Sequence, residues 1–307
     1  EDNTAEVGGG IYINESDVEL DHVTVKNNGS NFGGGIYATG SIVKLISSSV
    51  DSNIAYWGAG LYSEDSGFDI ERSNIRYNLA YIEGGAIYQN GNNMDISESA
   101  ITSNTGLDFG GALVCYMGIM DLDRITIAGN SSNYGSAFNM REAVIAISNS
   151  IVWENGENTV YSSSSSQASM MNIGYTNFYG GESYLSSSTS IILDWGDGNF
   201  DNDPLFCSVD SNNFSLQEGS YCLIASDTFG AIGTYSQGCG QILKVDYENI
   251  PIDYTLSQNY PNPFNPSTKI NFIVHKEGLV DISVFSISGR WITELVSQYQ
   301  TPGRYSV

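Results

Sequence analysis

Carboxylate side chains recur at one position of a repeating pattern and are the first residues that could perform chemistry. Asp69, Asp95 and Asp121 each lie nine residues before an asparagine that recurs along the chain. On neighbouring strands they would stand roughly 4.8 Å apart and repel one another. Calcium would relieve this repulsion with oxygen ligands, and paired carboxylates could also hydrolyse a glycosidic bond. A solvated acidic face is the alternative interpretation.

Arg72 and Arg124 are cationic residues close to this acidic column, each six residues before its asparagine. A lyase needs a base to remove the proton α to a carboxylate, so both arginines join the three aspartates as candidate catalytic residues. They are two repeats apart, too far to hold one group together, and Glu71, Glu98 and Asp123 lie beside them. Surface ion pairs are therefore the main expectation for both.

Aromatic residues form two further columns. If the apolar residue before each tyrosine points inward, the tyrosines point outward as a stacked stripe, and such a stripe can bind sugar rings. An aromatic ladder that only stabilises the stacking of strands is the alternative. The tyrosine column is Tyr12, Tyr37, Tyr62 and Tyr88, and the second column is Phe32, Trp57, Phe109 and Tyr134.

A second group of oxygen-bearing side chains lies beyond the repeats and offers another possible calcium site. Asp-Gly and Asp-Pro dipeptides also make turns, which is the alternative interpretation. The group contains Asp194, Asp197, Asn199, Asp201 and Asp203.

A repeat of 25 or 26 residues must position these side chains. In six copies, a Gly-rich segment leads into an apolar anchor residue, and an asparagine follows seventeen residues later. Repeats of this length are typical of solenoids, in which each unit buries its apolar face against its neighbours. The anchors are Ile11, Ile36, Leu61, Ile87, Leu113 and Phe138, and the asparagines are Asn28, Asn53, Asn78, Asn104, Asn130 and Asn155.

Apolar columns within the repeat predict strands rather than helices. Two of these columns lie ten and eight residues before the asparagine, with mostly polar residues between them, and a third lies three residues before it. This period of two is the spacing of a strand with one buried face. Three short strands per turn predict an all-β fold, a parallel β-helix solenoid. Asparagines at a fixed inward corner would then bond to one another as a structural ladder.

The chain divides into three parts. Regular coils reach residue 155, and irregular coils with a terminal cap follow over 156–240. Residues 241–255 form a linker, and five of the six prolines fall between 251 and 302. Alternating strands then follow around a Ser-Gly-Arg turn at 288–290.

Composition limits the partners and the compartment. A net charge of −24 argues against nucleic acid or an anionic membrane as a partner, since either needs a basic patch. The sequence has no run of 18 apolar residues that could cross a membrane as a helix. We expect any export signal to be missing from this sequence. Cys207 pairs with Cys222 or with the competing Cys239 if the protein is secreted, whereas Cys115 is expected to be a buried free thiol.

The runs Gly-Gly-Gly-Ile-Tyr at 33–37 and Gly-Gly-Ala-Ile-Tyr at 84–88 carry a resemblance. Residues 1–240 resemble the right-handed parallel β-helix proteins of the pectate-lyase-like superfamily, in particular bacterial polymorphic outer-membrane-protein repeats. The resemblance implies a right-handed coil. It leaves the function open, because this superfamily includes lyases, glycoside hydrolases, adhesins and passenger domains.

The stretch Tyr-Pro-Asn-Pro-Phe-Asn-Pro at 260–266 and the Ser-Gly-Arg turn at 288–290 carry a second resemblance. Residues 256–307 resemble the C-terminal sorting domain of proteins exported by the type IX (Por) secretion system. The resemblance implies a small β-sandwich, delivery by the outer-membrane secretion machinery, and a secreted or outer-surface location. Its last strands would begin where the sequence stops, so we expect the domain to be incomplete. The residues that carry the likeness are Tyr260, Pro261, Asn262, Pro263, Phe264, Asn265, Pro266 and Gly289.

These observations favour a non-enzymatic adhesin or a glycan-binding or scaffold module. A calcium-dependent polysaccharide lyase or glycoside hydrolase is the second interpretation. Only six Lys or Arg residues precede residue 240, which counts against polyuronate substrates. An acidic groove beside Arg72 or Arg124 would favour the enzyme, whereas a flat exposed strip would favour binding.

Overall fold

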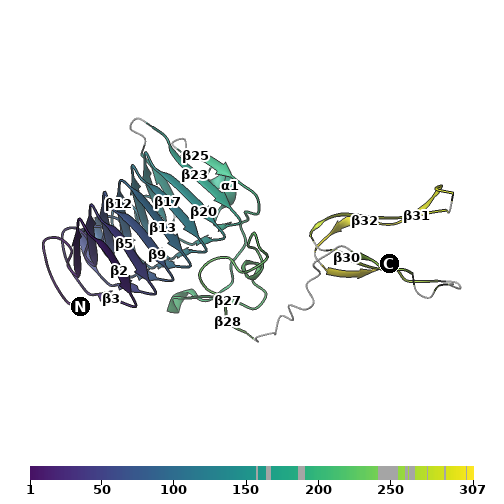
Figure 1. Ribbon diagram of the computed structural model, residues 1–307, viewed down its shortest axis with the longest axis horizontal. Helices are drawn as coiled ribbons and strands as arrows, with labels where there is room; N and C mark the ends of the chain where they lie inside the picture. Colours follow the sequence, from purple (N-terminus) through teal and green to yellow (C-terminus); the bar gives the residue numbers. More distant parts are fainter. Residues whose placement is uncertain are drawn as a thin grey trace. The chain divides into compact units, whose positions relative to one another are not determined.

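The computed structural model describes residues 1–156, 158–163, 167–185, 191–240, 255–259, 262, 267–274, 276–286, 288–301 and 303–307. They belong to two compact units, Glu1–Ile242 and Leu243–Val307. The first unit is a solenoid of parallel strands, which confirms the predicted all-β fold (Figure 1).

Three long sheets and one short sheet run along the solenoid. Sheet 1 contains β1 (Ile11–Asn14), β4 (Ile36–Thr39), β8 (Leu61–Glu64), β12 (Ile87–Asn90), β16 (Leu113–Tyr116), β19 (Phe138–Arg141) and β22 (Val160–Ser162). Sheet 2 contains β2 (Asp17–Asp21), β5 (Ile42–Ile46), β9 (Gly67–Glu71), β13 (Asn93–Ser97), β17 (Ile119–Asp123), β20 (Val144–Ser148), β23 (Ser169–Gly174) and β25 (Ile191–Trp195). Sheet 3 contains β3 (Thr24–Lys26), β6 (Ser49–Asp51), β10 (Asn74–Arg76), β14 (Ala100–Thr102), β18 (Thr126–Ala128), β21 (Ile151–Trp153) and β24 (Asn177–Phe178). Sheet 4 contains β7 (Ile54–Trp57), β11 (Leu79–Glu83) and β15 (Thr105–Gly106).

Each strand pairs in register with the equivalent strand of the next coil, so residues one repeat apart lie side by side. Ile36 pairs with Leu61 in sheet 1, and Asp95 pairs with Asp121 in sheet 2. The inward side chains of sheets 1, 2 and 3 form one continuous core, in which Leu61, Ile87 and Leu113 are fully buried. Removal of these apolar columns from water is the main stabilising term of the solenoid.

The predicted asparagine ladder is present and has one more member than the sequence pattern indicated. Asn53 donates from its backbone N–H and from Nδ2 to Asn78 Oδ1 at 2.9 and 3.0 Å, and the same pair of bonds recurs along the column. Asn3 adds a seventh position, with bonds of 3.1 and 3.2 Å to Asn28 Oδ1. Six of the seven asparagines are buried, so the ladder satisfies polar groups that the corner encloses.

Glycines before the anchors let adjacent coils approach closely. A Cβ atom on Gly85 would lie 2.3 Å from the carbonyl oxygen of Gly111 in the next coil, a distance that no real Cβ atom tolerates. These glycines therefore have a structural role.

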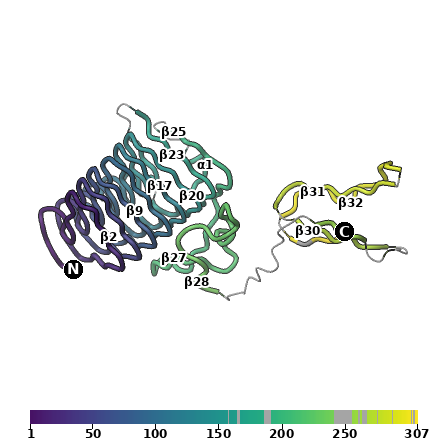
Figure 2. The backbone as a smooth tube through the Cα atoms, in the orientation of Figure 1, coloured from purple at the N-terminus to yellow at the C-terminus, as the bar shows by residue number. Residues whose placement is uncertain are grey.

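Residues 206–239 leave the stack of coils and contain a separate three-stranded sheet. Residues 191–200 still complete a coil, and the helix α1 (Gly181–Leu185) contributes Leu185 to the core. The chain then runs back outside the stacked coils (Figure 2) and lies along sheet 3. We call residues 206–239 the strap; it contains β26 (Phe206–Ser208), β27 (Asn213–Gln217) and β28 (Gln237–Cys239).

The strap lies on the apolar part of the outer face of sheet 3. Phe214, Leu216 and Ile232 pack there against Ala128 and Trp153. Hydrogen bonds fix the strap over several coils. Thr234 and Thr126 exchange two bonds of 3.0 Å, and the Tyr235 hydroxyl donates to Asn74 Oδ1 at 2.9 Å.

Cys207 and Cys239 form a disulfide that joins the two ends of the strap. Of the two predicted alternatives, the pairing with Cys222 is therefore wrong. Cys222, which belongs to the strap, is a buried free thiol, and Asn177 Nδ2 lies 3.3 Å from its sulfur. Cys115 is buried and free, as predicted.

The second unit contains two small antiparallel sheets. One joins β29 (Thr255–Leu256), β30 (Asn271–Val274) and β33 (Gly303–Ser306), and the other is the hairpin of β31 (Gly278–Phe285) and β32 (Trp291–Gln300). The predicted Ser-Gly-Arg turn closes this hairpin, with Gly289 at φ +79°. Asn262 is exposed, whereas Tyr260, Pro261, Pro263, Phe264, Asn265, Pro266 and the linker up to residue 254 lie outside the described residues. Within the described part of the chain, no helix is both long and apolar enough to cross a membrane.

Candidate functional site

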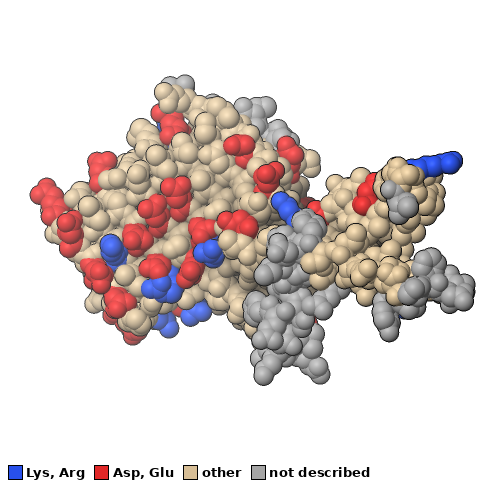
Figure 3. All heavy atoms as spheres, turned by 45° about the vertical axis from the view of Figure 1, so that its right-hand side comes forward, with Lys and Arg blue, Asp and Glu red and all other residues tan. Residues whose placement is uncertain are grey.

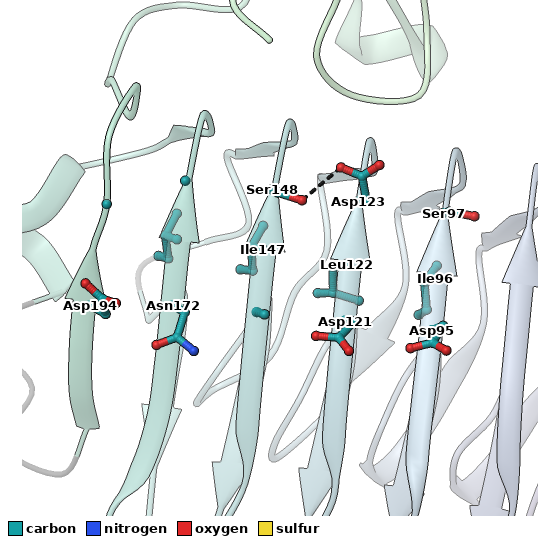
Figure 4. A pocket seen from close by; sticks show the side chains of 14 residues that line it. Asp95, Ile96, Ser97, Asp121, Leu122, Asp123, Ile147, Ser148, Asn172 and Asp194 are labelled. Carbon is teal, nitrogen blue, oxygen red and sulfur yellow. Dashed lines mark hydrogen bonds between the residues drawn. The ribbon is translucent and has the colours of Figure 1, made fainter. Parts of the chain in front are cut away.

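The acidic column lies on the outer face of sheet 2, as predicted. Asp69, Asp95 and Asp121 occupy equivalent positions of β9, β13 and β17 and pair in register. The same column continues through Ala146 and Asn172 to Asp194. Figure 4 shows Asp95, Asp121, Asn172 and Asp194 on the same face of β13, β17, β23 and β25, with β20 between Asp121 and Asn172.

A shallow groove of about 340 Å³ follows this column from Asp95 to Asp194. Its centre is open because Ala146 places only a methyl group between Asp121 and Asn172. Asp123 lies at one edge of the groove and accepts a hydrogen bond of 2.8 Å from the Ser148 hydroxyl. Asp69 does not line this groove, which therefore holds two of the three predicted aspartates.

The carboxylates of the groove influence one another. Partial burial raises the pKa of Asp95 above its ordinary value of 3.8, and the negative charges of Asp121 and Asp69 raise it further. Each additional negative charge near Asp95 costs electrostatic free energy, so the groove disfavours an anionic ligand.

The calcium ion considered above for the acidic column does not fit the arrangement of the described residues. Calcium requires six to eight oxygen ligands converging on one point. Among the described residues, no three His, Cys, Asp or Glu side chains are grouped closely enough to hold one ion. The aspartates of the column stand in a row along the sheet instead of surrounding a centre.

In the acidic loop after β25, side-chain oxygens accept hydrogen bonds from backbone N–H groups, which agrees with the alternative interpretation of a turn. Asp203 Oδ1 accepts from the backbone N–H of Leu205 at 2.8 Å, and Asn199 Oδ1 accepts from that of Thr176 at 3.0 Å. Asp194 lies apart from this loop in the groove, while Asp197 and Asp201 are exposed.

Arg72 and Arg124 lie at the corner between sheets 2 and 3, both in the left-handed backbone region. Arg72 forms an ion pair with Glu71, and Arg124 lies 3.5 Å from Asp123, as expected for surface pairs. Both arginines line a different groove, of about 460 Å³, between this corner and strap residues such as Tyr235. The arginines and the aspartates of the column therefore do not share a groove.

The four predicted tyrosines stack, but three of them are nearly buried. Ring centroids lie 5.6, 5.2 and 4.7 Å apart from Tyr12 through Tyr37 and Tyr62 to Tyr88. Tyr12 is 56% exposed, whereas the others are at most 9% exposed beneath a layer that includes Trp57. The Tyr37 hydroxyl donates to Glu64. The tyrosines therefore lie outside the main core, as expected, but only Tyr12 is open to solvent, and the other three form the stacked aromatic ladder of the alternative interpretation.

Two sets of surface residues were not predicted from the sequence. Asn172 belongs to the groove and pairs with Ala146. Its position could not be predicted because it lies beyond Asn155, where the regular repeat ends. Tyr56 and Tyr81 are 47% and 45% exposed on sheet 4. Their common position, three residues after the ladder asparagines, is a signal that the sequence contains.

Acidic side chains are scattered over the visible surface of the first unit, and basic ones are few (Figure 3). The geometry defines a parallel β-solenoid with an acidic groove on one face. Searches of protein-family models, curated proteins and solved structures gave no match to the chain.

Proposed function

We propose that this chain is a secreted or outer-surface protein whose solenoid binds a glycan without catalysis. The observation that carries the proposal is the separation of charges. Asp95 and Asp121 line the groove of sheet 2, whereas Arg72 and Arg124 line the groove beside the strap.

The groove suits a neutral, extended glycan. Carboxylate oxygens of Asp95, Asp121 and Asp194 accept hydrogen bonds from sugar hydroxyls, and the Asn172 amide both donates and accepts. Successive coils repeat these groups at roughly 4.8 Å, which is close to the length of one sugar in an extended chain. Negative charge along the groove disfavours uronates and other anionic chains.

The same arrangement argues against the lyase or hydrolase interpretation. Glycoside hydrolases place two carboxyl groups on either side of the scissile bond. Asp95 and Asp121 instead lie side by side on one wall and point in the same direction. Neither arginine that could act as a lyase base lines the groove, although Arg124 lies 3.5 Å from the edge residue Asp123.

The second unit supports the delivery part of the proposal. The likeness of residues 256–307 to type IX sorting domains implies a turn at 288–290 between two strands, and the hairpin of β31 and β32 has it. Likewise, the Gly-Gly-Ala-Ile-Tyr runs and the stacked coils are compatible with a right-handed helix of the pectate-lyase-like superfamily.

Affinity electrophoresis tests the binding proposal. Gels containing hydroxyethyl cellulose, laminarin or mannan are expected to retard the protein, and polygalacturonate is not. The Asp95→Asn/Asp121→Asn variant is expected to lose most of the retardation. Glu19→Gln is the matched control, because Glu19 occupies the same column outside the groove.

Reducing-end and unsaturated-product assays with and without calcium address catalysis. Turnover of any of these polysaccharides would overturn the non-enzymatic proposal. Delivery is tested by expression in a bacterium with a type IX system. Removal of residues 256–307 is expected to abolish surface or extracellular delivery, and unchanged delivery would refute this role.

A further inference from the structure

Sheet 4 carries an exposed apolar platform that is separate from the acidic groove. We define the aromatic platform as Ile54, Tyr56, Tyr81 and Leu107, which are 42%, 47%, 45% and 46% exposed respectively. Ala55 pairs with Ala80 in register, which places Tyr56 beside Tyr81 in the neighbouring coil. The ring centroids of the two tyrosines lie 5.6 Å apart at an interplanar angle of 49°.

The backbone beneath the platform holds these rings at a fixed spacing. Ala55 and Ala80 lie directly below and are buried. Leu79 donates its backbone N–H to the Asn53 carbonyl at 2.9 Å, and Leu107 donates to the Ala80 carbonyl at the same distance. Stacked, hydrogen-bonded coils leave the rings little freedom to lose on binding, which favours affinity.

Charge and size indicate what the platform binds. Glu83, on the same strand as Tyr81, accepts a hydrogen bond of 2.7 Å from the Tyr116 hydroxyl. It interacts electrostatically with Asp108 of the next coil and with Arg141, so two carboxylates and one cation lie near one end of the platform. An anionic ligand is disfavoured there. A second copy of this chain is disfavoured by its net charge of −24. Four exposed side chains are also too few for a stable protein interface, which buries about 800 Å² per partner.

We propose that Tyr56 and Tyr81 stack against the sugar rings of a neutral saccharide, as a second contact site that rests on the glycan-binding function proposed above. Tyrosine offers a flat apolar face for the C–H side of a pyranose ring and a hydroxyl for its polar edge. Nearby carboxylate oxygens accept hydrogen bonds from sugar hydroxyls.

Affinity electrophoresis in hydroxyethyl cellulose, laminarin and mannan tests this site with a Tyr56→Ala/Tyr81→Ala variant. Both side chains are exposed, so we expect the variant to fold like the unaltered protein by circular dichroism. We expect a roughly tenfold loss of affinity for the retained polysaccharide, as befits the removal of two aromatic contacts. Tyr299→Ala is the matched control, because Tyr299 is 78% exposed in the second unit.

Trp57 provides a second readout, since its ring lies 6.0 Å from that of Tyr56. A neutral oligosaccharide on the platform is expected to change Trp57 emission in a saturable way, and Asp95→Asn/Asp121→Asn should leave this change intact.

Three outcomes would overturn the site. The first is unchanged retardation of Tyr56→Ala/Tyr81→Ala in a gel where the groove variant loses it, which would leave the glycan-binding function standing. The second is equal retention by polygalacturonate, which would contradict a neutral ligand. The third is no retention by any polysaccharide, which would refute the proposed function together with this site.

Discussion

Truncation of Asn78 tests the asparagine ladder at its centre. Asn78 Nδ2 donates to the Val50 carbonyl at 3.0 Å and to Asn104 Oδ1 at 2.9 Å. Its Oδ1 accepts from the backbone N–H of Asn53 at 2.9 Å and from Asn53 Nδ2 at 3.0 Å. In Asn78→Ala, Asn53 Nδ2 keeps its bond to the Val25 carbonyl, and Asn104 Oδ1 keeps its bond to the Asn78 backbone. The Asn53 N–H loses the acceptor that the side chain supplied, and the Val50 carbonyl loses a donor.

The expected loss of stability follows from these unpaired groups. A buried polar group without a partner costs about 1–3 kcal/mol, so Asn78→Ala should lower the free energy of unfolding by about 2–5 kcal/mol. This is a large fraction of the roughly 5–15 kcal/mol that stabilises a typical domain. Urea unfolding at 25 °C followed by circular dichroism measures the change, and hydrogen exchange at the Asn53 amide reports the local effect.

Asn3→Ala is the matched control at the edge of the ladder. Asn3 is exposed and only donates to Asn28, so its truncation should cost less than about 1 kcal/mol. Equal destabilisation by the two variants would refute the reasoning, because the cost would then not depend on burial.

Three further predictions concern packing, cross-linking and charge. Gly85→Ala should destabilise the solenoid by more than about 2 kcal/mol in urea unfolding, because the new Cβ meets backbone 2.3 Å away, whereas Gly278→Ala should change little since open space surrounds that position. Cys207→Ser or Cys239→Ser should lower the unfolding free energy by about 2–4 kcal/mol and speed proteolysis of the strap, because the disulfide closes a loop with a sequence separation of 32. Asp95→Asn should raise the melting temperature slightly at pH 7 and not at pH 3. The corresponding gain in the free energy of unfolding should be well under about 1 kcal/mol, because the site is largely exposed.

The sign of the last prediction follows from the raised pKa of Asp95. A raised pKa means that the folded state favours the protonated carboxyl, so ionisation destabilises the fold above that pKa. The penalty disappears as pH falls through the raised pKa towards the ordinary value of 3.8. A stabilisation by Asp95→Asn that persists at pH 3 would contradict this origin. Detection of four free thiols in the unreduced, denatured protein would contradict the disulfide, and equal effects of the two glycine variants would contradict the close approach.

Much of the fold was predictable because each coil repeats the same local geometry. The pairs Ile36 with Leu61 and Asp95 with Asp121 follow directly from the constant distance between anchor and asparagine. The outward direction of the acidic column followed in the same way, since alternate residues of a strand face opposite sides. The burial of Tyr62 did not follow, because it depends on Phe32 and Trp57 packing over it from another sheet.

The sequence by itself determined the period, the register, the ladder from Asn28 to Asn155 and the hairpin around Gly289. These features depend on contacts between equivalent positions one coil apart or on a local turn, so a pattern in the chain is enough to reveal them. Only the tertiary structure decided that the strap folds back onto sheet 3, that Cys207 bonds to Cys239, and that the arginines and aspartates line separate grooves. Each of those results depends on segments that meet without any shared period, as Thr126 and Thr234 do across 108 residues, and no local pattern encodes such a meeting.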